Sequence, residues 1–457
     1  MSVISKKPSL TLFDSATGEV KPAPSKEHVS FYACGITPYS SSHIGHGRSF
    51  VVFDQMVRLL RQSGKKVMFV RNITDIDDKI IQEAKKQNMS WHELSAQFAE
   101  ENRTLFNKMG ILEDVLEPKA SEHLQDMFFL IEKMMEKDLA YVSETGDVLF
   151  DTQKGTQGSF VQVDKDKLMG GRVASTGKRH EEDFVLWKKA KEDEPSFEGP
   201  FGRGRPGWHL ECSSMIFQLL GEQIDYHGGG VDLKFPHHHA ECLQTHAVTG
   251  KDLAKHWLHH GVIRDEVGRK MSKSLGNVIY LKDAISYAEK LAGAQGGELL
   301  RLALLGTIWT KPMDFSYKLV DQMWGKVKHW AEALDGRIPQ NKFVDSEAVR
   351  SLFDNMNTPL FFTKMHNLAE KAKQGDENSQ DALSYALFVF GVSPSLLKQS
   401  LVQEVSSENE EVIASLLKQR DILRQEKNFK EADRLRDRLV ALGWNGSDAP
   451  LGQSFKP

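Results

Sequence analysis

The sequence has 457 residues, and ordinary domain sizes predict roughly two to four domains for this length. Charged residues make up 27% and hydrophobic residues 40%, a composition typical of soluble globular proteins and unlike that of membrane-embedded ones. The net charge of −4 argues against indiscriminate binding to nucleic acid, so a polyanionic partner would have to contact local basic patches.

Targeting signals and cysteine usage bound the compartment. No apolar run reaches the ~18 residues that a membrane helix needs, and the N-terminal residues lack the pattern of a signal peptide. The three cysteines, Cys34, Cys212 and Cys242, are too few for a disulfide scaffold. We therefore expect a cytoplasmic protein whose thiols are available to bind a metal or a substrate.

The first predicted elements are a strand, a loop and a helix. A half-apolar run at residues 29–33 predicts the strand, and apolar periodicity predicts a helix over 45–63 that closes at Gly64. A second strand at 67–70, followed by polar helices, completes half of a parallel α/β nucleotide-binding unit.

The pattern then changes twice. Short strands at 139–142 and 147–150, among Gly-rich and Lys-rich loops, indicate an insertion over about 119–205. The α/β pattern resumes near Trp208, and after Asp314 the sequence is helical, with amphipathic stretches around 319–334, 349–372 and 382–389.

The C-terminal segment differs in charge. Acidic residues 404–411 predict a linker, and the apolar spacing over 412–439 predicts a helical hairpin that ends at Gly443. The hairpin carries Lys418, Arg420, Arg424, Lys427, Lys430, Arg434, Arg436 and Arg438. This local basic surface is the kind that a nucleic-acid partner requires.

Two short strings together predict an ATP site. The string His43-Ile44-Gly45-His46 opens the first helix, whose N-terminus offers backbone N–H groups and the positive end of a dipole to a polyphosphate. Gly35, Gly45 and Gly47 would let a ligand approach the backbone. The string 270–274, Lys-Met-Ser-Lys-Ser, lies between two glycines and predicts a lysine-bearing loop over the same phosphates.

Soft and borderline ligands indicate a zinc site. Cys34 and Cys212 follow strands of the two α/β halves, where such folds place ligands. In the segment 235–242, Phe-Pro-His-His-His-Ala-Glu-Cys, two pairs have i, i+4 helical spacing: His237 with Glu241, and His238 with Cys242. Either pair could complete a four-ligand site, and the prevalence of thiolates in structural zinc sites favours Cys242.

The two strings, with residues 31–37 (Phe-Tyr-Ala-Cys-Gly-Ile-Thr) and 71–80 (Arg-Asn-Ile-Thr-Asp-Ile-Asp-Asp-Lys-Ile), resemble the signatures of class I aminoacyl-tRNA synthetases, and among them the cysteinyl-tRNA synthetase family. The likeness runs from about residue 25 to the end. It implies an α/β fold with a split Rossmann-type catalytic domain and an inserted connective domain, followed by an all-helical bundle and a small anticodon-binding domain. The domains would span 1–118 and 206–263 (catalytic halves), 119–205 (insertion), 264–318 (signature loop and stem contact), 319–403 (bundle) and 404–457 (anticodon binding).

The resemblance also implies roles for single residues. It favours Cys34, Cys212, His237 and Glu241 as ligands of one Zn²⁺, with Cys242 packed nearby; His239 and Ala240 depart from the Glu and Asn that the family often has there. It assigns catalysis of adenylate formation to His43, His46, Lys270 and Lys273, and ATP binding to Gly45, His46, Asp232 and Lys273. Thr74, Trp208 and His227 would bind the amino acid, and Mg²⁺ would accompany ATP.

The implied reaction joins L-cysteine to tRNA(Cys) with ATP, through a cysteinyl adenylate, in a monomeric enzyme. Arg424, Phe429, Asp433 and Asp448 match positions that contact the anticodon, whereas the closing residues 453–457 depart from the family pattern. Two alternatives are a ligase that passes activated cysteine to an amino sugar, and a non-catalytic RNA-binding paralogue. The basic hairpin argues against the first, and the intact signature strings argue against the second.

Overall fold

A computed structural model describes the protein in two compact units, residues 1–397 and 398–457. The described residues are 8–156, 158, 160, 177–192, 194–272, 275–401, 407–425 and 428–441.

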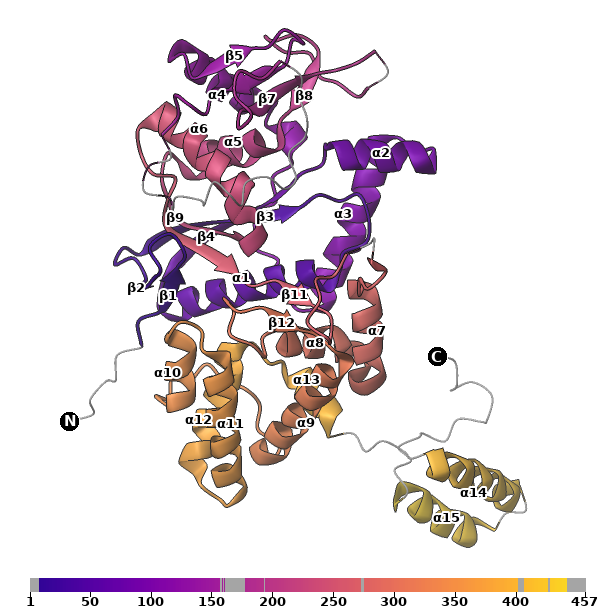
Figure 1. Ribbon diagram of the computed structural model, residues 1–457. Helices are drawn as coiled ribbons and strands as arrows, with labels where there is room; N and C mark the ends of the chain where they lie inside the picture. The colour runs from indigo at the N-terminus through magenta and orange to yellow at the C-terminus, as the bar shows by residue number, and fades with distance from the viewer. Residues whose placement is uncertain are drawn as a thin grey trace, which may run out of the picture. The chain divides into compact units, whose positions relative to one another are not determined.

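A four-stranded parallel sheet forms the centre of the first unit (Figure 1), in the order β10 (Ala254–His260), β9 (Ile224–Gly230), β3 (His28–Ile36) and β4 (Lys66–Ile73). β3 and β4 precede the predicted insertion in the sequence, and β9 and β10 follow it. This arrangement confirms the predicted split α/β fold. A hairpin of β1 (Thr11–Asp14) and β2 (Glu19–Pro22) precedes the sheet.

Helix α1 (Ile44–Gln62) follows β3 and packs on the sheet. Its apolar residues are buried, and Gly64, two residues beyond its end, has φ +88°, as the predicted stop requires. Phe31 of β3 packs against Phe53 of α1 and Phe69 of β4, with ring centroids 5.8 and 5.1 Å apart. Complete burial of such a ring stabilises the fold by roughly 1.5–3 kcal/mol, so the apolar periodicity sets where the helix docks.

The chain between β4 and β9 carries α2 (Asp78–Gln87), α3 (Trp91–Lys108) and α4 (Leu124–Glu136). The predicted insertion then forms an antiparallel sheet of β5 (Ala140–Val142), β6 (Val148–Phe150), β7 (Phe184–Lys189) and β8 (Gly204–Pro206). Asp78, at the start of α2, binds Arg205 of β8 at 2.6 Å and Lys188 of β7 at 2.7 Å. This ion cluster fixes the inserted sheet against the α/β unit.

The chain returns to the central sheet through α5 (Trp208–Leu220), β9, α6 (His239–Thr249) and β10. Two short strands, β11 (Ile263–Arg264) and β12 (Met313–Asp314), pair in parallel, and α7 (Leu281–Ala292) and α8 (Gly296–Leu304) lie between them in the sequence.

Helices α9 (Tyr317–Leu334), α10 (Glu347–Phe353), α11 (Thr358–Lys373) and α12 (Glu377–Phe390) form the predicted bundle, which lies below α1 in Figure 1. The amphipathic stretch 349–372 is two helices because Asn355 and Met356 have positive φ and break the helix between them. Asp54 of α1 and Arg301 of α8 form a buried ion pair at 3.3 Å, which joins the helix on the sheet to α8.

The second unit is a helical hairpin of α14 (Ser407–Gln425) and α15 (Phe429–Ala441), preceded by α13 (Pro394–Ser400), which crosses the division between the units. Residues 407–411 were predicted as linker, but they form the first turns of α14. An acidic run at a helix N-terminus is stabilised by the helix dipole, and this explains the difference. The predicted end at Gly443 lies outside the described residues.

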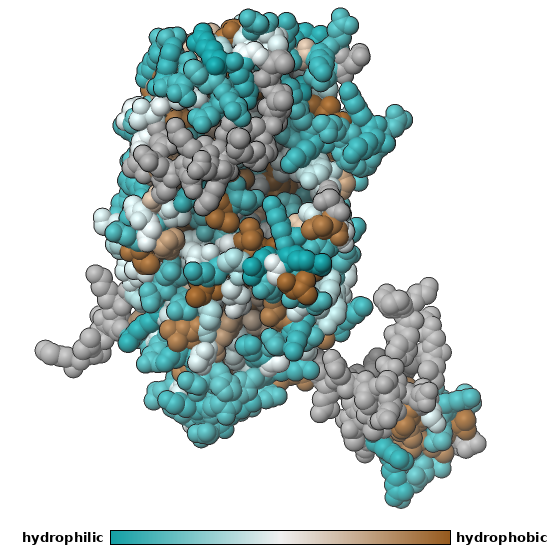
Figure 2. Space-filling view, viewed as in Figure 1, coloured by the Kyte–Doolittle hydropathy of each residue, from teal (hydrophilic) through white to brown (hydrophobic). Residues whose placement is uncertain are grey.

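The surface of the first unit is mainly hydrophilic on the face drawn in Figure 2, with hydrophobic residues scattered across its middle. Within the described part of the chain, every helix is too short or too polar to cross a membrane.

Candidate active site and metal centre

Four elements meet beyond the carboxyl end of the parallel sheet. Cys34 lies near the end of β3, and His227 lies on the neighbouring strand β9, where Tyr32 of β3 is its register partner. Cys212 lies on α5, one turn after Trp208, and Glu241 lies in the first turn of α6. Parallel α/β sheets bind ligands at this edge, so the topology itself brings the predicted residues together.

The four predicted metal ligands converge in space. Their ligand atoms, from Cys34, Cys212, His237 and Glu241, all lie within 4.8 Å of one another, and all four side chains are buried. His237 Nε2 is 2.8 Å from Glu241 Oε1 and 3.5 Å from Cys212 Sγ. The i, i+4 spacing that the sequence offered therefore places both side chains on one side of the turn into α6. Their binding of a metal stays a prediction.

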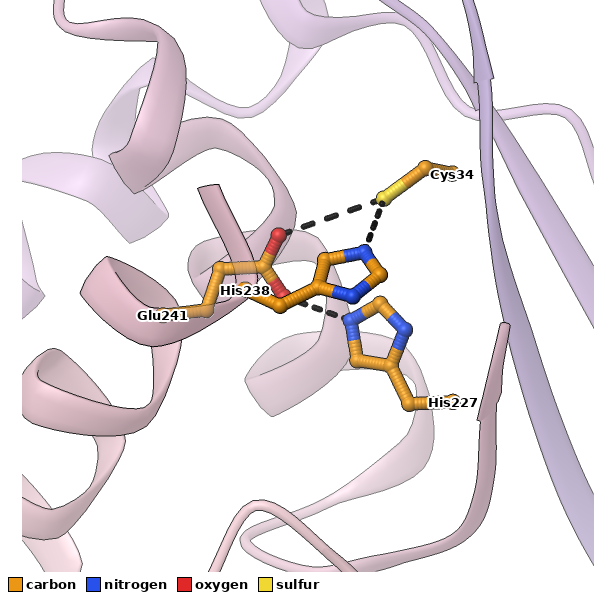
Figure 3. A group of neighbouring side chains, drawn as sticks. All are labelled: Cys34, His227, His238 and Glu241. Carbon is orange, nitrogen blue, oxygen red and sulfur yellow. Dashed lines mark hydrogen bonds and ion pairs between the residues drawn. The ribbon is translucent and has the colours of Figure 1, made fainter. Parts of the chain in front are cut away.

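A second group overlaps the first and shares Cys34 and Glu241 with it. Figure 3 shows Cys34 and Glu241 with His227 and His238, whose ligand atoms also lie within 4.8 Å of one another. His238 Nε2 is 3.2 Å from Cys34 Sγ, and His227 Nε2 is 2.5 Å from Glu241 Oε2. Glu241 thus presents one oxygen to each group.

Burial and contacts within the cluster shift the pKa values of its members. A hydrogen bond from the Cys34 thiol lowers the pKa of Cys212 to about 6, whereas burial raises the pKa of Cys34 well above its ordinary value. Burial opposes charge on Glu241, yet His227 and His237 hold the pKa of its carboxyl well below the usual range. Burial also opposes charge on His237, but Glu241 raises its pKa to about 10.

The directions of these pKa shifts favour the charged forms of Cys212, Glu241 and His237 within one buried space. Zn²⁺ prefers thiolate, imidazole and carboxylate ligands, and it displaces protons from such ligands when it binds. The donor set fits zinc. The group containing Cys212 fits better than the one in Figure 3, because it offers two sulfurs and because Trp208, 38% exposed, stacks on His237 at 4.1 Å and leads from the surface to this side of the cluster.

Two other features bear on metal binding. Cys242 is buried but belongs to neither group, and burial raises the pKa of its thiol well above the ordinary value. A third group, His329, His366 and Glu370, lies on α9 and α11. There Lys373 Nζ is 3.0 Å from His329 Nδ1, so that nitrogen accepts and the proton of the neutral ring sits on Nε2. This tautomer disfavours a metal at the third group.

The predicted amino-acid pocket residues surround the same cluster. Thr74, at the end of β4, is buried, and its hydroxyl donates to Glu211 Oε2 at 2.9 Å and accepts from Asn72 Nδ2 at 3.1 Å. His227 is fully buried and stacks on Trp257 at 4.7 Å. Asp232, in the short turn after β9, is exposed. Trp208 thus stacks on the candidate ligand His237, and His227 contacts the candidate ligand Glu241. Thr74 bonds Glu211, the residue before Cys212.

The first signature string forms the N-terminus of α1. His43 is the N-cap residue: its Nδ1 accepts the Gly45 N–H at 3.1 Å, and His46 Nδ1 accepts the His43 N–H at 3.3 Å. The two rings stack 3.9 Å apart. Because both Nδ1 atoms accept, the ring N–H of each histidine lies on Nε2, which can donate to a phosphate oxygen.

Two glycines near the site leave no room for a side chain. A Cβ atom on Gly35 would lie 1.7 Å from the carbonyl oxygen of Asn72, so the neighbouring strand by itself excludes a side chain at this position. On Gly45 a Cβ would meet the His43 ring at 2.8 Å, which makes this glycine a condition for the histidine cap.

The second signature string comes back to the first. The backbone of Lys270 forms an antiparallel β-bridge with that of Arg264. The chain then returns, and Tyr280 forms an antiparallel β-bridge with His43. The Ile44 N–H donates to the Ile279 carbonyl at 3.1 Å, and the Leu281 N–H donates to the Ser42 carbonyl at 2.8 Å. The structure thus brings the segment after Lys270 beside the histidine string. Lys273 lies outside the described residues.

In the second unit, three of the predicted anticodon residues are described. Arg424 lies in the last turn of α14, Phe429 begins α15 with 58% of its surface exposed, and Asp433 pairs with Arg436 at 3.6 Å. Asp448 lies outside the described residues. An exposed ring beside basic residues is available to stack on an unpaired base.

The sequence did not indicate several neighbours of the site. His209 Nδ1 is 2.9 Å from His237 Nδ1, and His259 Nε2 is 2.8 Å from His238 Nδ1. Glu211 orients the Thr74 hydroxyl. These contacts join residues far apart in sequence, and apart from the unusual number of histidines in this region no local signal marks them.

Comparison with known proteins defines the class first. The family description "tRNA synthetases class I (C) catalytic domain" matches residues 20–324. A methionyl-tRNA synthetase of Mycobacterium tuberculosis, solved with methionyl-adenylate, is similar with a TM-score of 0.54 and 16% identity over 82% of this chain and 90% of that one. This likeness shows the fold alone.

Curated relatives then give the particular family. A cysteine–tRNA ligase of Sulfurihydrogenibium sp. is 36% identical over 98% of this chain and 99% of its own length. One from Methylocella silvestris is 40% identical over 91% of each chain. The chain belongs to the cysteine–tRNA ligase family of class I tRNA synthetases.

Proposed function

We propose that this protein ligates L-cysteine to tRNA(Cys) in an ATP-dependent reaction that passes through an enzyme-bound cysteinyl adenylate. The observation that carries the proposal is the buried group of Cys34, Cys212, His237 and Glu241 at the carboxyl edge of the sheet that also holds the histidine string. A sulfur-binding centre beside an ATP site fits a substrate that has both a thiol and a carboxylate.

Selectivity is the reason for a metal at this place. Serine differs from cysteine by one atom, and pocket shape alone rarely separates such near-isosteres by more than ~100-fold. One Zn²⁺ per chain, held by the four residues, would supply a borderline-soft Lewis acid that binds the substrate sulfur as a thiolate. Glu241 is the harder ligand of the set, and its hydrogen bond to His227 keeps the carboxylate oriented.

The chain's own residues position the rest of the substrate. Trp208 stacks on His237 and is partly exposed, so it can contact a substrate that approaches the metal group. Thr74 already donates its proton to Glu211, so the hydroxyl oxygen offers its remaining lone pair to the substrate ammonium. Asp232 is exposed after β9, where it could accept hydrogen bonds from the ribose of ATP.

In the first step the cysteine carboxylate attacks the α-phosphorus of ATP, a P–O bond forms, the bond from that phosphorus to the bridging oxygen breaks, and pyrophosphate leaves. Mg²⁺ that accompanies ATP would neutralise part of the pyrophosphate charge. His43 and His46 would donate from Nε2 to the phosphate oxygens, and Gly45 keeps the approach to the helix N-terminus open. Lys270 and Lys273 would stabilise the negative charge that develops on the phosphates. In the second step the 2′-hydroxyl of the terminal adenosine attacks the adenylate carbonyl, an ester C–O bond forms, the C–O bond to the phosphate breaks, and AMP leaves with the hydroxyl proton on its phosphate.

The helical hairpin of the second unit would read the tRNA. Arg424, Phe429 and Asp433 are exposed there, and they join a stacking surface to hydrogen-bonding groups. Asp448 is proposed as a further contact. A ligase that transfers cysteine to an amino sugar would have no use for this unit, so the hairpin favours tRNA as the acceptor. We further propose that the enzyme is a cytoplasmic monomer.

The test is amino-acid-dependent ATP–pyrophosphate exchange, followed by charging of tRNA(Cys). Cysteine should support exchange and serine should not, and one equivalent of zinc should accompany the purified protein. Failure of cysteine to support exchange in zinc-replete protein would contradict the proposal. Exchange without charging of tRNA(Cys) would favour the amino-sugar alternative.

A further inference from the structure

One side-chain amide, that of Asn277, bonds the main chain of the loop that carries Lys270 at two places. Asn277 Oδ1 accepts the Ser272 N–H at 2.9 Å, and Asn277 Nδ2 donates to the Lys270 carbonyl at 3.2 Å. One amide group therefore contacts the main chain on both sides of Met271, as a neighbouring strand would. The backbone of the signature string is thus fixed from a residue that lies beyond it in sequence.

Asp265 holds the asparagine in turn. Its Oδ2 accepts from Asn277 Nδ2 at 3.1 Å and from Arg269 Nε at 2.9 Å, and its Oδ1 accepts the Arg269 N–H at 2.8 Å. The Asp265 N–H donates to the Arg269 carbonyl at 2.9 Å, and Gly268, with φ +81°, closes the tight turn between them. Asp265 is only 8% exposed, so its carboxylate is a fixed acceptor.

The hydrogen bonds of Asp265 and Asn277, which we call the brace, continue to the histidine string 43–46. Three residues beyond Asn277, Tyr280 pairs with His43, and the Ile44 N–H is bonded to the Ile279 carbonyl. The path from Lys270 through Asn277 to His43 consists of short, directed hydrogen bonds and three residues of chain. It therefore sets the distance between the two parts of the ATP site.

We propose that Asp265 and Asn277 are positioning residues for adenylate formation: together they hold the main chain at Lys270 and Ser272 in register with the histidine string. This rests on the proposed function for its chemistry. Neither side chain is assigned a contact with ATP. Their effect is geometric, and a displacement of about 1 Å at a catalytic group costs on the order of 10²-fold in rate.

The experiment compares Asn277→Ala, Asp265→Asn and the double variant with the wild-type protein. Asn341→Ala, which changes an exposed asparagine between α9 and α10, is the matched control. We expect kcat of cysteine-dependent exchange to fall by roughly 10- to 100-fold in Asn277→Ala, because the lysine acts in the transition state. KM for cysteine should stay within about twofold, since the metal group is untouched.

Two further results separate positioning from general damage. Because the side chains act as one unit, the double variant should lose no more than about the larger of the two single losses. The inference would be overturned if the kcat losses of the two single variants multiplied in the double variant. An unchanged kcat in Asn277→Ala would overturn it too, as would a KM for cysteine that rises in step with the fall in kcat.

Hydrogen exchange of the peptide containing Ser272 gives a readout that does not depend on activity. Asn277→Ala should expose the Ser272 amide and speed its exchange, with no change in the peptides of α1 or in zinc content. An unchanged rate at Ser272 would refute the brace. A wild-type protein that shows no cysteine-dependent ATP–pyrophosphate exchange would instead refute the proposed function. The hydrogen-exchange rate of the Ser272 amide would still decide whether the brace exists.

Discussion

Cys242→Ala should leave zinc bound to the protein, whereas Cys212→Ala should abolish zinc binding. Cys242 is 4% exposed and belongs to neither metal-binding group, so its loss removes one buried atom at a cost of about 1 kcal/mol in unfolding free energy. Cys212 lies 3.5 Å from His237 Nε2 and has a pKa of about 6, so its loss removes the sulfur most ready to bind.

The magnitude follows from binding linkage. A ligand present at 1,000 times its Kd stabilises the folded state by about 4 kcal/mol, and Cys212→Ala should lose that zinc-dependent part. The assay is metal content after dialysis, with thermal unfolding measured with and without EDTA. Cys242→Ala should keep one zinc and an EDTA-sensitive Tm, and Cys212→Ala should show neither. Loss of zinc in Cys242→Ala together with retention in Glu241→Ala would refute the ligand set.

Three other predictions test separate parts of the molecule. Lys273→Ala should slow pyrophosphate exchange by roughly 10²-fold or more while cysteine binding barely changes, because a cation aimed at transition-state charge is lost; an unaltered rate would contradict its role. Deleting residues 405–457 should leave exchange largely intact and weaken tRNA charging, and equal loss of both in a folded protein would argue against modular recognition. Asp54→Ala should lower the unfolding free energy by about 3–5 kcal/mol, since Arg301 would keep a buried charge without its carboxylate partner; a denaturant midpoint close to wild type would disprove this.

The fold could be predicted where the pattern is local. The strand at 29–33, the helix that closes before Gly64 and the helical hairpin all follow from apolar periodicity and end signals. The break inside 349–372 could not be predicted in this way, because periodicity continues across Asn355 and Met356 while their backbone turns to positive φ.

Some features of the candidate site are also visible in the sequence, and others depend on the fold. The i, i+4 spacing of His237 and Glu241 is visible in sequence, but only the fold brings Cys34 and Cys212 to the same place. The roles of Asn277 as a brace and of Glu211 as an acceptor for Thr74 depend on contacts between distant residues, which composition and spacing do not encode. The position of Lys273 remains a prediction of the motif alone.

The central claim is that a metal held by Cys34, Cys212, His237 and Glu241 selects the thiol of the substrate. The most direct measurement is the ratio of kcat/KM for cysteine and serine in pyrophosphate exchange, before zinc removal, after it, and after zinc is restored. With zinc bound we expect a ratio well above ~100, the limit that pocket shape alone allows. Cysteine activity should collapse when zinc is removed and recover when zinc is added back. Full discrimination in zinc-free protein would contradict this claim.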